Sequence, residues 1–233
     1  MYFDAIEIGT AHFETEIQED SPFLRTKQQE GLVTYRGRIL SVEPVKCYLD
    51  ELPARENCYK EHAAVSNYDG EVSVWYITPE NLVKYGLSAD GADWWMMGCN
   101  SINSPHPTML KLFNKHRNVP EHKMYKALLT DVFSVDEVKC YNPESLFRKY
   151  DVEGVSYLKI DTEGHDAVIL LDYFDYCEEH PHLKAKWIVH ENNKLLSEED
   201  KEAIKVRASQ LGYDWQGLDG NPLCYDRLLT LRL

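Results

Sequence analysis

Residues 155–173 read VSYLKIDTEGHDAVILLDY. The segment 155–161 is apolar and predicts a buried strand, and 166–173 predicts a helix after a turn at Gly164. Lys159, Asp161 and Glu163 are spaced two apart, so in an extended chain they would point to one face. A strand that passes through a short turn into a helix is the building block of parallel α/β sheets.

Similar units surround this stretch. Apolar strands are predicted in FDAIEIG (3–9), GRILSVEP (37–44), HAAVSN (62–67), EVSVWYIT (71–78) and KAKWIVHE (184–191). Helices are predicted at 46–56, at 142–150 with Asn142 as cap, and at 197–212 between Ser197 and Gly212, and the tail from 212 predicts a β-hairpin. We therefore expect an α/β, doubly wound, Rossmann-like fold: a mostly parallel seven-stranded sheet with helices on both faces and a terminal β-hairpin.

We expect one domain over residues 1–233. Residues 86–122 are rich in Gly and Pro and predict loops with a short helix near 107–116, forming a loop or lid insertion on the substrate side. The chain starts almost directly on a core strand. It is therefore either a minimal enzyme or one domain of a larger protein, such as a glycan-modifying one.

Charge and cysteine content limit the class of protein. A net charge of −14 disfavours nucleic acid as a partner, because it would repel a phosphate backbone. The six cysteines are scattered without a CxxC motif, which favours reduced thiols and a cytoplasmic location. No apolar run approaches the roughly 20 residues that span a bilayer, so we expect no membrane span.

Acidic residues follow several predicted strands, and in a parallel sheet such strand ends share one edge, where ligands bind. These residues are Glu7, Glu43, Asp161 and Glu191. Gly9 follows the first strand without completing GxGxxG, which disfavours a dinucleotide-binding oxidoreductase. Glu43 is placed to accept both hydroxyls of a ribose, and Ser66 to bond an adenine edge. The predicted cofactor residues are Glu7, Gly9, Thr10, Ala11, Glu43, Pro44, Ser66 and Asp161.

The segment KIDTEGHD (159–166) resembles the KxDxEGxE signature of FkbM-type methyltransferases. The resemblance extends over roughly residues 3–226 through EIGT (7–10), SVEP (41–44), AVSNYDG (64–70), GCNSI (98–102), IVHEN (188–192) and GYDWQGLDGNPLCY (212–225). The chain departs from the family at 11–13, where Ala-His-Phe replaces a second glycine, and at Asp166, where the family has Glu.

This resemblance implies S-adenosylmethionine-dependent methyl transfer to a hydroxyl, most often of a sugar or small metabolite. A hydroxyl needs a base to become a good nucleophile. We predict Asp161 as that base, and Lys159 as the group that orients it or lowers the pKa of the acceptor hydroxyl. Glu163 is a further catalytic residue expected to touch substrate hydroxyls, and His165 and His190 are alternative bases.

The acceptor, a small molecule or a glycan, is predicted to contact a separate set of residues. Trp94 and Trp95 form a wall or lid, although this patch is equally compatible with a tucked core segment. The full set is Trp94, Trp95, Asn100, Ser101, Glu191 and Asn192.

Other functions stay open. In one, Asp161, Glu163, Glu191 and Asn192 bind Mg²⁺ for a metal-assisted O-methyl transfer to another metabolite. We do not favour it, because Lys159 would repel the cation, and we predict no metal ligand. A non-catalytic binding protein and a methyltransferase acting on protein or nucleic acid are further alternatives.

Overall fold

The computed structural model describes residues 1–11, 37–54, 56–84, 87–91, 93–116, 132–217 and 226–232. The chain forms two compact units. The first consists of Met1–Gly70 together with Lys139–Leu233, and the second of Glu71–Val138.

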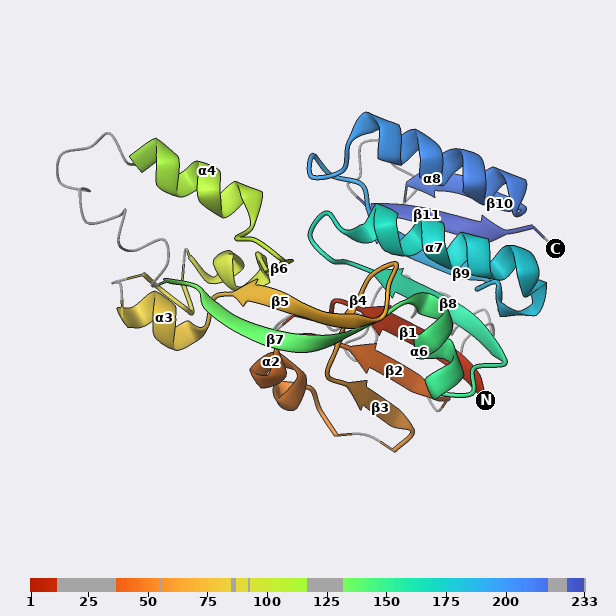
Figure 1. Cartoon of the computed structure of the whole chain (residues 1–233), viewed down its shortest axis with the longest axis horizontal. Coiled ribbons are helices and arrows are strands. Elements are labelled where there is room, and N and C mark those ends of the chain that lie inside the picture. Colours follow the sequence, from red (N-terminus) through yellow and green to blue (C-terminus); the bar gives the residue numbers. More distant parts are fainter. Residues whose placement is uncertain are drawn as a thin grey trace. The chain divides into compact units, whose positions relative to one another are not determined.

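The first unit is built on a seven-stranded sheet with the order β10-β11-β9-β8-β1-β2-β3 (Figure 1). Neighbouring strands from β3 to β9 are parallel, and β11 and β10 are added antiparallel. The mostly parallel sheet and its terminal hairpin confirm the predicted fold. The strands are β1 (Tyr2–Ile8), β2 (Ile39–Val42), β3 (Cys58–Glu61), β8 (Gly154–Ile160), β9 (Trp187–Glu191), β10 (Tyr213–Gly217) and β11 (Asp226–Leu231).

Helices of the first unit begin where the sequence places capping residues. The Asn142 side chain accepts a hydrogen bond from the Ser145 amide at 2.8 Å, and Ser197 accepts one from the Asp200 amide at 3.0 Å. Gly212, with φ of +94°, follows the last of these helices. The helices are α2 (Lys46–Glu51), α6 (Pro143–Lys149), α7 (Asp166–Glu179) and α8 (Glu198–Gln210), with a 3₁₀ turn at Pro181–Leu183.

The main core lies between one face of this sheet and helices α6, α7 and α8 (Figure 1). Phe3 and Leu158 of the sheet belong to the same buried cluster as Phe147, Phe174 and Ile204 of the helices. The opposite face carries a smaller buried cluster that includes Ala5, Tyr157 and Trp187.

The strand predicted at 62–67 was expected to be the third strand of the main sheet, and this position is wrong. Its place in the sheet is taken by β3 at 58–61, and Ala64–Val65 form β4, which pairs with β7 (Ser134–Tyr141) in a second sheet. The segment CYKE of β3 is only partly buried, so its apolar signal is weak. Because β4 is buried in the second sheet, its apolar residues reveal burial but not the strand with which they pair.

The second unit contains most of a four-stranded sheet with the order β4-β7-β5-β6. The predicted strand at 71–78 is found as β5 (Gly70–Tyr76), and the predicted helix at 107–116 as α4 (Pro107–His116). Charged residues along SVDEVKCY hide β7 from the sequence patterns. The remaining elements are α3 (Pro79–Lys84), a 3₁₀ helix at Trp94–Gly98 and β6 (Ser101–Ile102). Within the described parts of the chain, no helix has the length and apolarity to cross a membrane.

Candidate functional site

The carboxyl ends of β1 and β8 lie side by side at the point where the strand order reverses. From β1 the chain continues to β2 and β3 on one side, and from β8 to β9 on the other. Glu7 is the register partner of Lys159, and the Asp161 amide donates a hydrogen bond to the Ile8 carbonyl at 3.0 Å. In open α/β sheets this switch point is where ligands bind.

The backbone conformation and close packing at position 9 require glycine. Its φ is +82°, and a Cβ at this position would lie 1.9 Å from the Asp161 carbonyl oxygen. Only glycine allows the β1 loop to approach the β8 loop this closely. Ala11, in place of the family's second glycine, also has a positive φ of +48°. The loop 9–11 therefore takes its turn despite that departure.

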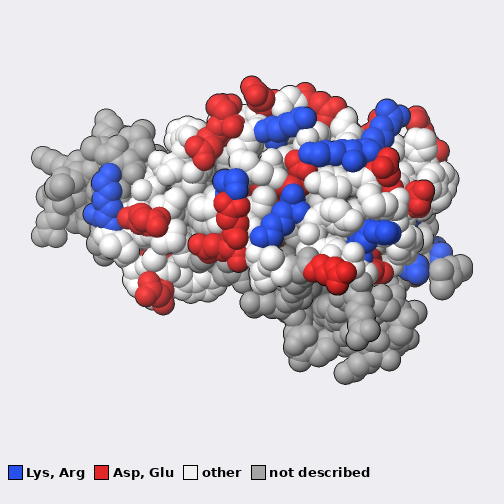
Figure 2. Space-filling view, turned by 90° about the horizontal axis from the view of Figure 1, so that it is seen from below, with Lys and Arg blue, Asp and Glu red and all other residues white. Residues whose placement is uncertain are grey.

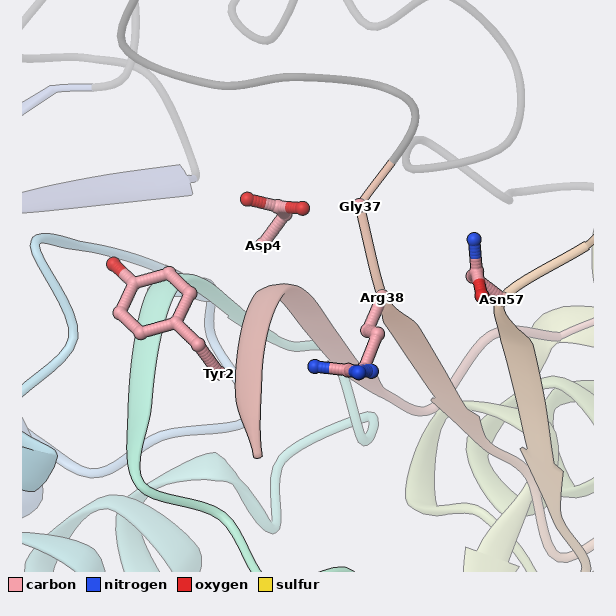
Figure 3. A pocket seen from close by; sticks show the side chains of 5 residues that line it. All are labelled: Tyr2, Asp4, Gly37, Arg38 and Asn57. Carbon is pink, nitrogen blue, oxygen red and sulfur yellow. The ribbon is translucent and has the colours of Figure 1, made fainter.

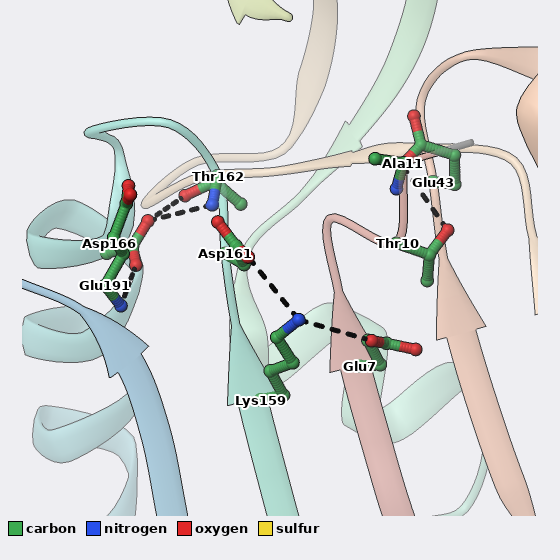
Figure 4. A network of polar contacts seen from close by, with 9 residues as sticks. All are labelled: Glu7, Thr10, Ala11, Glu43, Lys159, Asp161, Thr162, Asp166 and Glu191. Atoms are coloured by element: carbon green, nitrogen blue, oxygen red, sulfur yellow. Dashed lines mark hydrogen bonds and ion pairs between the residues drawn. The ribbon is translucent and has the colours of Figure 1, made fainter. Parts of the chain in front are cut away.

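Glu43, at the end of β2, forms hydrogen bonds with the loop that follows β1. It is buried, and its carboxylate accepts hydrogen bonds from the amides of Ala11 and Val45, both at 2.9 Å, and from the Thr10 hydroxyl at 3.4 Å (Figure 4). Burial raises its pKa to about 7, against the lowering effect of these bonds. The next residue, Pro44, receives at its carbonyl a contact from His62 Nε2 at 3.0 Å. Three predicted cofactor residues, Thr10, Ala11 and Glu43, are thus brought together.

The Lys159 side chain lies between the carboxylates of Glu7 and Asp161. Its ammonium is 3.7 Å from Glu7 and 3.4 Å from Asp161, and it is 4% exposed (Figure 4). The predicted contact between Lys159 and Asp161 is therefore present. Strand β8 ends at Ile160 and Glu163 has a φ of +54°, so the two-residue alternation does not continue to Glu163.

Asp166 joins the β8 loop to strand β9, a role that the sequence patterns do not indicate. The fully buried carboxylate accepts bonds from the Thr162 amide at 2.9 Å and hydroxyl at 2.6 Å, and from the Glu191 amide at 3.0 Å (Figure 4). Burial, and then the charge of Asp161, raise its pKa to about 7. Two signals pointed to this position: it is the last acid of the KIDTEGHD segment, and it is the first residue of α7, where acids are common.

Glu191 ends β9 beside this group. Burial raises its pKa to about 8, and the charges of Asp161, Glu163 and Asp166 add to the rise. Among the described residues, neither Glu191 Oε2 nor Oδ1 of the next residue, Asn192, has a hydrogen-bond partner, although both atoms are buried. Such atoms are expected to meet a ligand or water.

The side chains of His165 and His190, the two alternative bases, both make contacts within the protein. His165 Nε2 lies 2.9 Å from the Ser66 hydroxyl, and burial lowers its pKa. His190 is fully buried, bonds its neighbour's carbonyl through Nδ1, and packs on Trp215, with burial lowering its pKa to about 4. In both residues burial disfavours the protonated imidazole.

The remaining predicted acceptor residues belong to the second unit. Trp94 is 43% exposed, whereas Met96 and Met97 are buried, so the patch is partly a core segment. Ser101 donates its hydroxyl to the Ser104 carbonyl. Asn100 Oδ1 is buried and has no hydrogen-bond partner among the described residues. That these residues line the acceptor side stays a prediction.

A pocket of about 260 Å³ lies at the opposite, amino end of β1 and β2 (Figure 3). Tyr2, Asp4 and Arg38 are among the five residues that line it, and none of them is a predicted site residue. On the face shown in Figure 2, acidic and basic side chains of the described residues are interspersed without a continuous basic surface. The described residues contain no group of three His, Cys, Asp or Glu arranged to hold a metal ion.

The seven-stranded sheet, with its acidic strand ends at the switch point, defines a Rossmann-like protein of the methyltransferase class. A family profile described as "Methyltransferase FkbM domain" matches residues 8–208, and the chain belongs to this family of methyltransferases. Neither a curated protein nor a solved structure matches the chain.

Proposed function

We propose that the chain is an S-adenosylmethionine-dependent O-methyltransferase that acts on a hydroxyl of a small molecule or glycan, with a sugar as the favoured acceptor. The observation that carries the proposal is the buried Glu43 at the end of β2, bonded to the loop that leaves β1. Family membership supports methyl transfer, which makes the oxidoreductase alternative unnecessary.

The residues at the switch point fit a nucleoside methyl donor. Gly9 lets the loop after β1 pack directly against the Asp161 backbone, which keeps the carboxyl ends of β1 and β8 side by side at the proposed donor site. Three hydrogen bonds occupy part of the Glu43 carboxylate, which has about four lone-pair positions to offer. When bound, S-adenosylmethionine supplies an electrophilic methyl group. The residues proposed to hold it are Glu7, Gly9, Thr10, Ala11, Glu43, Pro44, Ser66 and Asp161.

The reacting side must position a hydroxyl and accept its proton. Asp161, held by Lys159, and the neighbouring Glu163 and Glu191 supply carboxylates for both tasks. Asn192, with its buried amide oxygen, is a further contact for a donor hydroxyl. A polyhydroxylated acceptor suits a site rich in hydrogen-bond acceptors, which supports a sugar.

The proposal further includes a cytoplasmic location and a role without nucleic acid. Residues 86–122 would then act on the acceptor side.

Calorimetric titration with S-adenosylhomocysteine, with and without EDTA, tests the cofactor. We expect micromolar binding in both conditions, and Glu43→Ala should weaken it by about 1–3 kcal/mol because bonds to a charged acceptor are lost. The exposed Glu56→Ala serves as the control for loss of a carboxylate. Unchanged affinity in Glu43→Ala would contradict the ribose assignment, and binding that requires metal would favour the Mg²⁺ alternative.

A further inference from the structure

We propose that Glu191, through its Oε2 atom, is the group that takes the proton from the acceptor hydroxyl. This inference rests on the proposed function and assigns to Glu191 the role that the sequence predicts for Asp161. The first requirement for a base is a carboxylate oxygen that is buried at the site and able to accept a hydrogen bond. Glu7 is buried as well, but its carboxylate is paired with the Lys159 ammonium.

Glu191 Oε2 meets that condition. The atom is buried, and no hydrogen-bond partner for it lies in the described parts of the chain. The backbone of Glu191 is fixed because its amide donates a hydrogen bond to Asp166. A hydrogen bond with the Asn193 side chain reaches its carboxyl group. A buried acceptor without a partner is unfavourable unless a ligand or water satisfies it.

The other carboxylates are already engaged. Both oxygens of Asp166 accept hydrogen bonds, two from Thr162 and one from the Glu191 amide. Asp161 shares the Lys159 ammonium with Glu7, so its carboxylate is already ion-paired. Asp166 and Asp161 are therefore committed to contacts within the protein, whereas Glu191 Oε2 has no hydrogen-bond partner among the described residues.

The histidines are poorly placed for this task. His165 Nε2 is within hydrogen-bond distance of Ser66. His190 alternates with Glu191 along β9 and therefore faces the side of the sheet covered by α7 and α8, where it packs on Trp215.

Electrostatics supports the assignment. The elements around Glu191 bring anions close to it, and a proton on its carboxyl group relieves their repulsion. A base is most effective when its pKa lies near the working pH, which the value of about 8 satisfies. The charged groups that act on Glu191 are Asp161 and Glu163 of the β8 loop and Asp166 of α7. His190 precedes it on β9, and on β11 Asp226 is the register partner of Glu191 and Arg227 that of His190.

The chemical step balances without a further reactant. The acceptor oxygen forms a bond to the methyl carbon as the carbon–sulfur bond breaks, and that electron pair stays on sulfur. The hydroxyl proton moves to Oε2 of Glu191, and water removes it before the next turnover.

The test uses the two forms of the cofactor and needs no acceptor. The sulfonium of S-adenosylmethionine carries a positive charge that S-adenosylhomocysteine lacks, and a nearby cation favours the ionised form of a carboxyl group. Titrations of the whole chain at pH 7 with EDTA, in phosphate and in Tris, yield the number of protons released from the difference in heat. We expect S-adenosylmethionine to release more protons than S-adenosylhomocysteine.

Glu191→Gln should remove most of this difference, and the remainder comes from Asp166 and Glu43, whose pKa values are also raised to about 7. Both ligands should still bind within about threefold of the unmodified chain, because one neutral contact is worth only about 1 kcal/mol. Binding also shows that the variant is folded. Glu191→Asp should retain part of the difference. Exposed Glu202→Gln is the matched control and should release protons as the unmodified chain does.

The outcomes separate two failures. If neither ligand binds the unmodified chain, the proposed function is wrong. If both bind but the difference is undiminished in Glu191→Gln, or falls only in Asp161→Asn, then Glu191 is not the proton acceptor and the cofactor assignment survives. If both bind with no difference in the unmodified chain, the inference about Glu191 is likewise overturned.

Discussion

The two sides of the switch point each bury acids, but they treat the charge differently. At the ends of β1 and β2, Glu43 is bonded by the amides and hydroxyl of its own loop. At the ends of β8 and β9, the carboxyl of Glu191 is surrounded by other acids and keeps one oxygen without a partner in the described residues. Burial raises the pKa of both acids, but Glu43 uses its oxygens to hold its own loop, whereas Glu191 keeps one for a ligand or water.

The largest effect should come from breaking the charge pairing beneath the reacting side. Lys159→Met leaves Glu7 and Asp161 without their shared ammonium in a buried position. We expect the free energy of unfolding to fall by about 3–5 kcal/mol, because breaking a buried ion pair leaves uncompensated charge. Urea unfolding measures this loss.

Lys205→Met, which removes an exposed partner of Glu202, is the control and should change stability by less than about 1 kcal/mol. Equal effects of the two lysine variants would show that the Lys159 pairing does not stabilise the fold.

Gly9→Ala should disrupt the close contact between the loop after β1 and the loop after β8. The added Cβ would overlap the Asp161 carbonyl and sit at a positive φ, so we expect a loss of about 3 kcal/mol in unfolding free energy. Gly212→Ala shares the positive φ but meets only Leu231 at 3.9 Å, and should lose about 1 kcal/mol. Thermal unfolding of both separates the overlap from the strain, and a Gly9→Ala loss no larger than that of Gly212→Ala would exclude the overlap.

The pH dependence of the free energy of unfolding tests the raised pKa of Glu43. Its pKa rises from 4.5 to about 7 on folding, so the folded state binds the proton more tightly than the unfolded state. The free energy of unfolding should therefore fall as pH rises through this window. In Glu43→Gln that part of the fall, on the order of 2 kcal/mol, should be absent.

Chemical unfolding of both proteins at pH 5, 6, 7 and 8 measures the difference. Asp166 and Glu191 titrate in both proteins, so subtracting the two curves isolates Glu43. Parallel curves would mean that Glu43 does not carry this linkage.

The smallest effect concerns the bond between Ser66 and His165. Ser66→Ala removes a hydrogen bond between the end of β4 and the loop before α7, and should lower stability by about 1 kcal/mol. A double-mutant cycle with His165→Ala gives the coupling energy of the pair. A coupling energy near zero would show that the two side chains act separately.

Much of the frame could be predicted from local patterns. Strand and helix periods, the caps at Asn142 and Ser197, and the turn at Gly9 depend on residues near one another in the sequence. Strand pairing was harder. The segment 64–65 was predicted for the main sheet and belongs to the second one, because its apolar character records burial and not the identity of its partner.

The sequence by itself determined the fold class, the family signature and the acids that end β1, β2, β8 and β9, since these follow from local spacing and residue type. Only the tertiary structure decided which of those acids are bonded and which are crowded. It assigned Asp166 to the link between β8 and β9, and joined Ser66 to His165 across 99 positions. The physical reason is that hydrogen bonding and desolvation depend on neighbours in space, and those neighbours come from segments far apart in the chain.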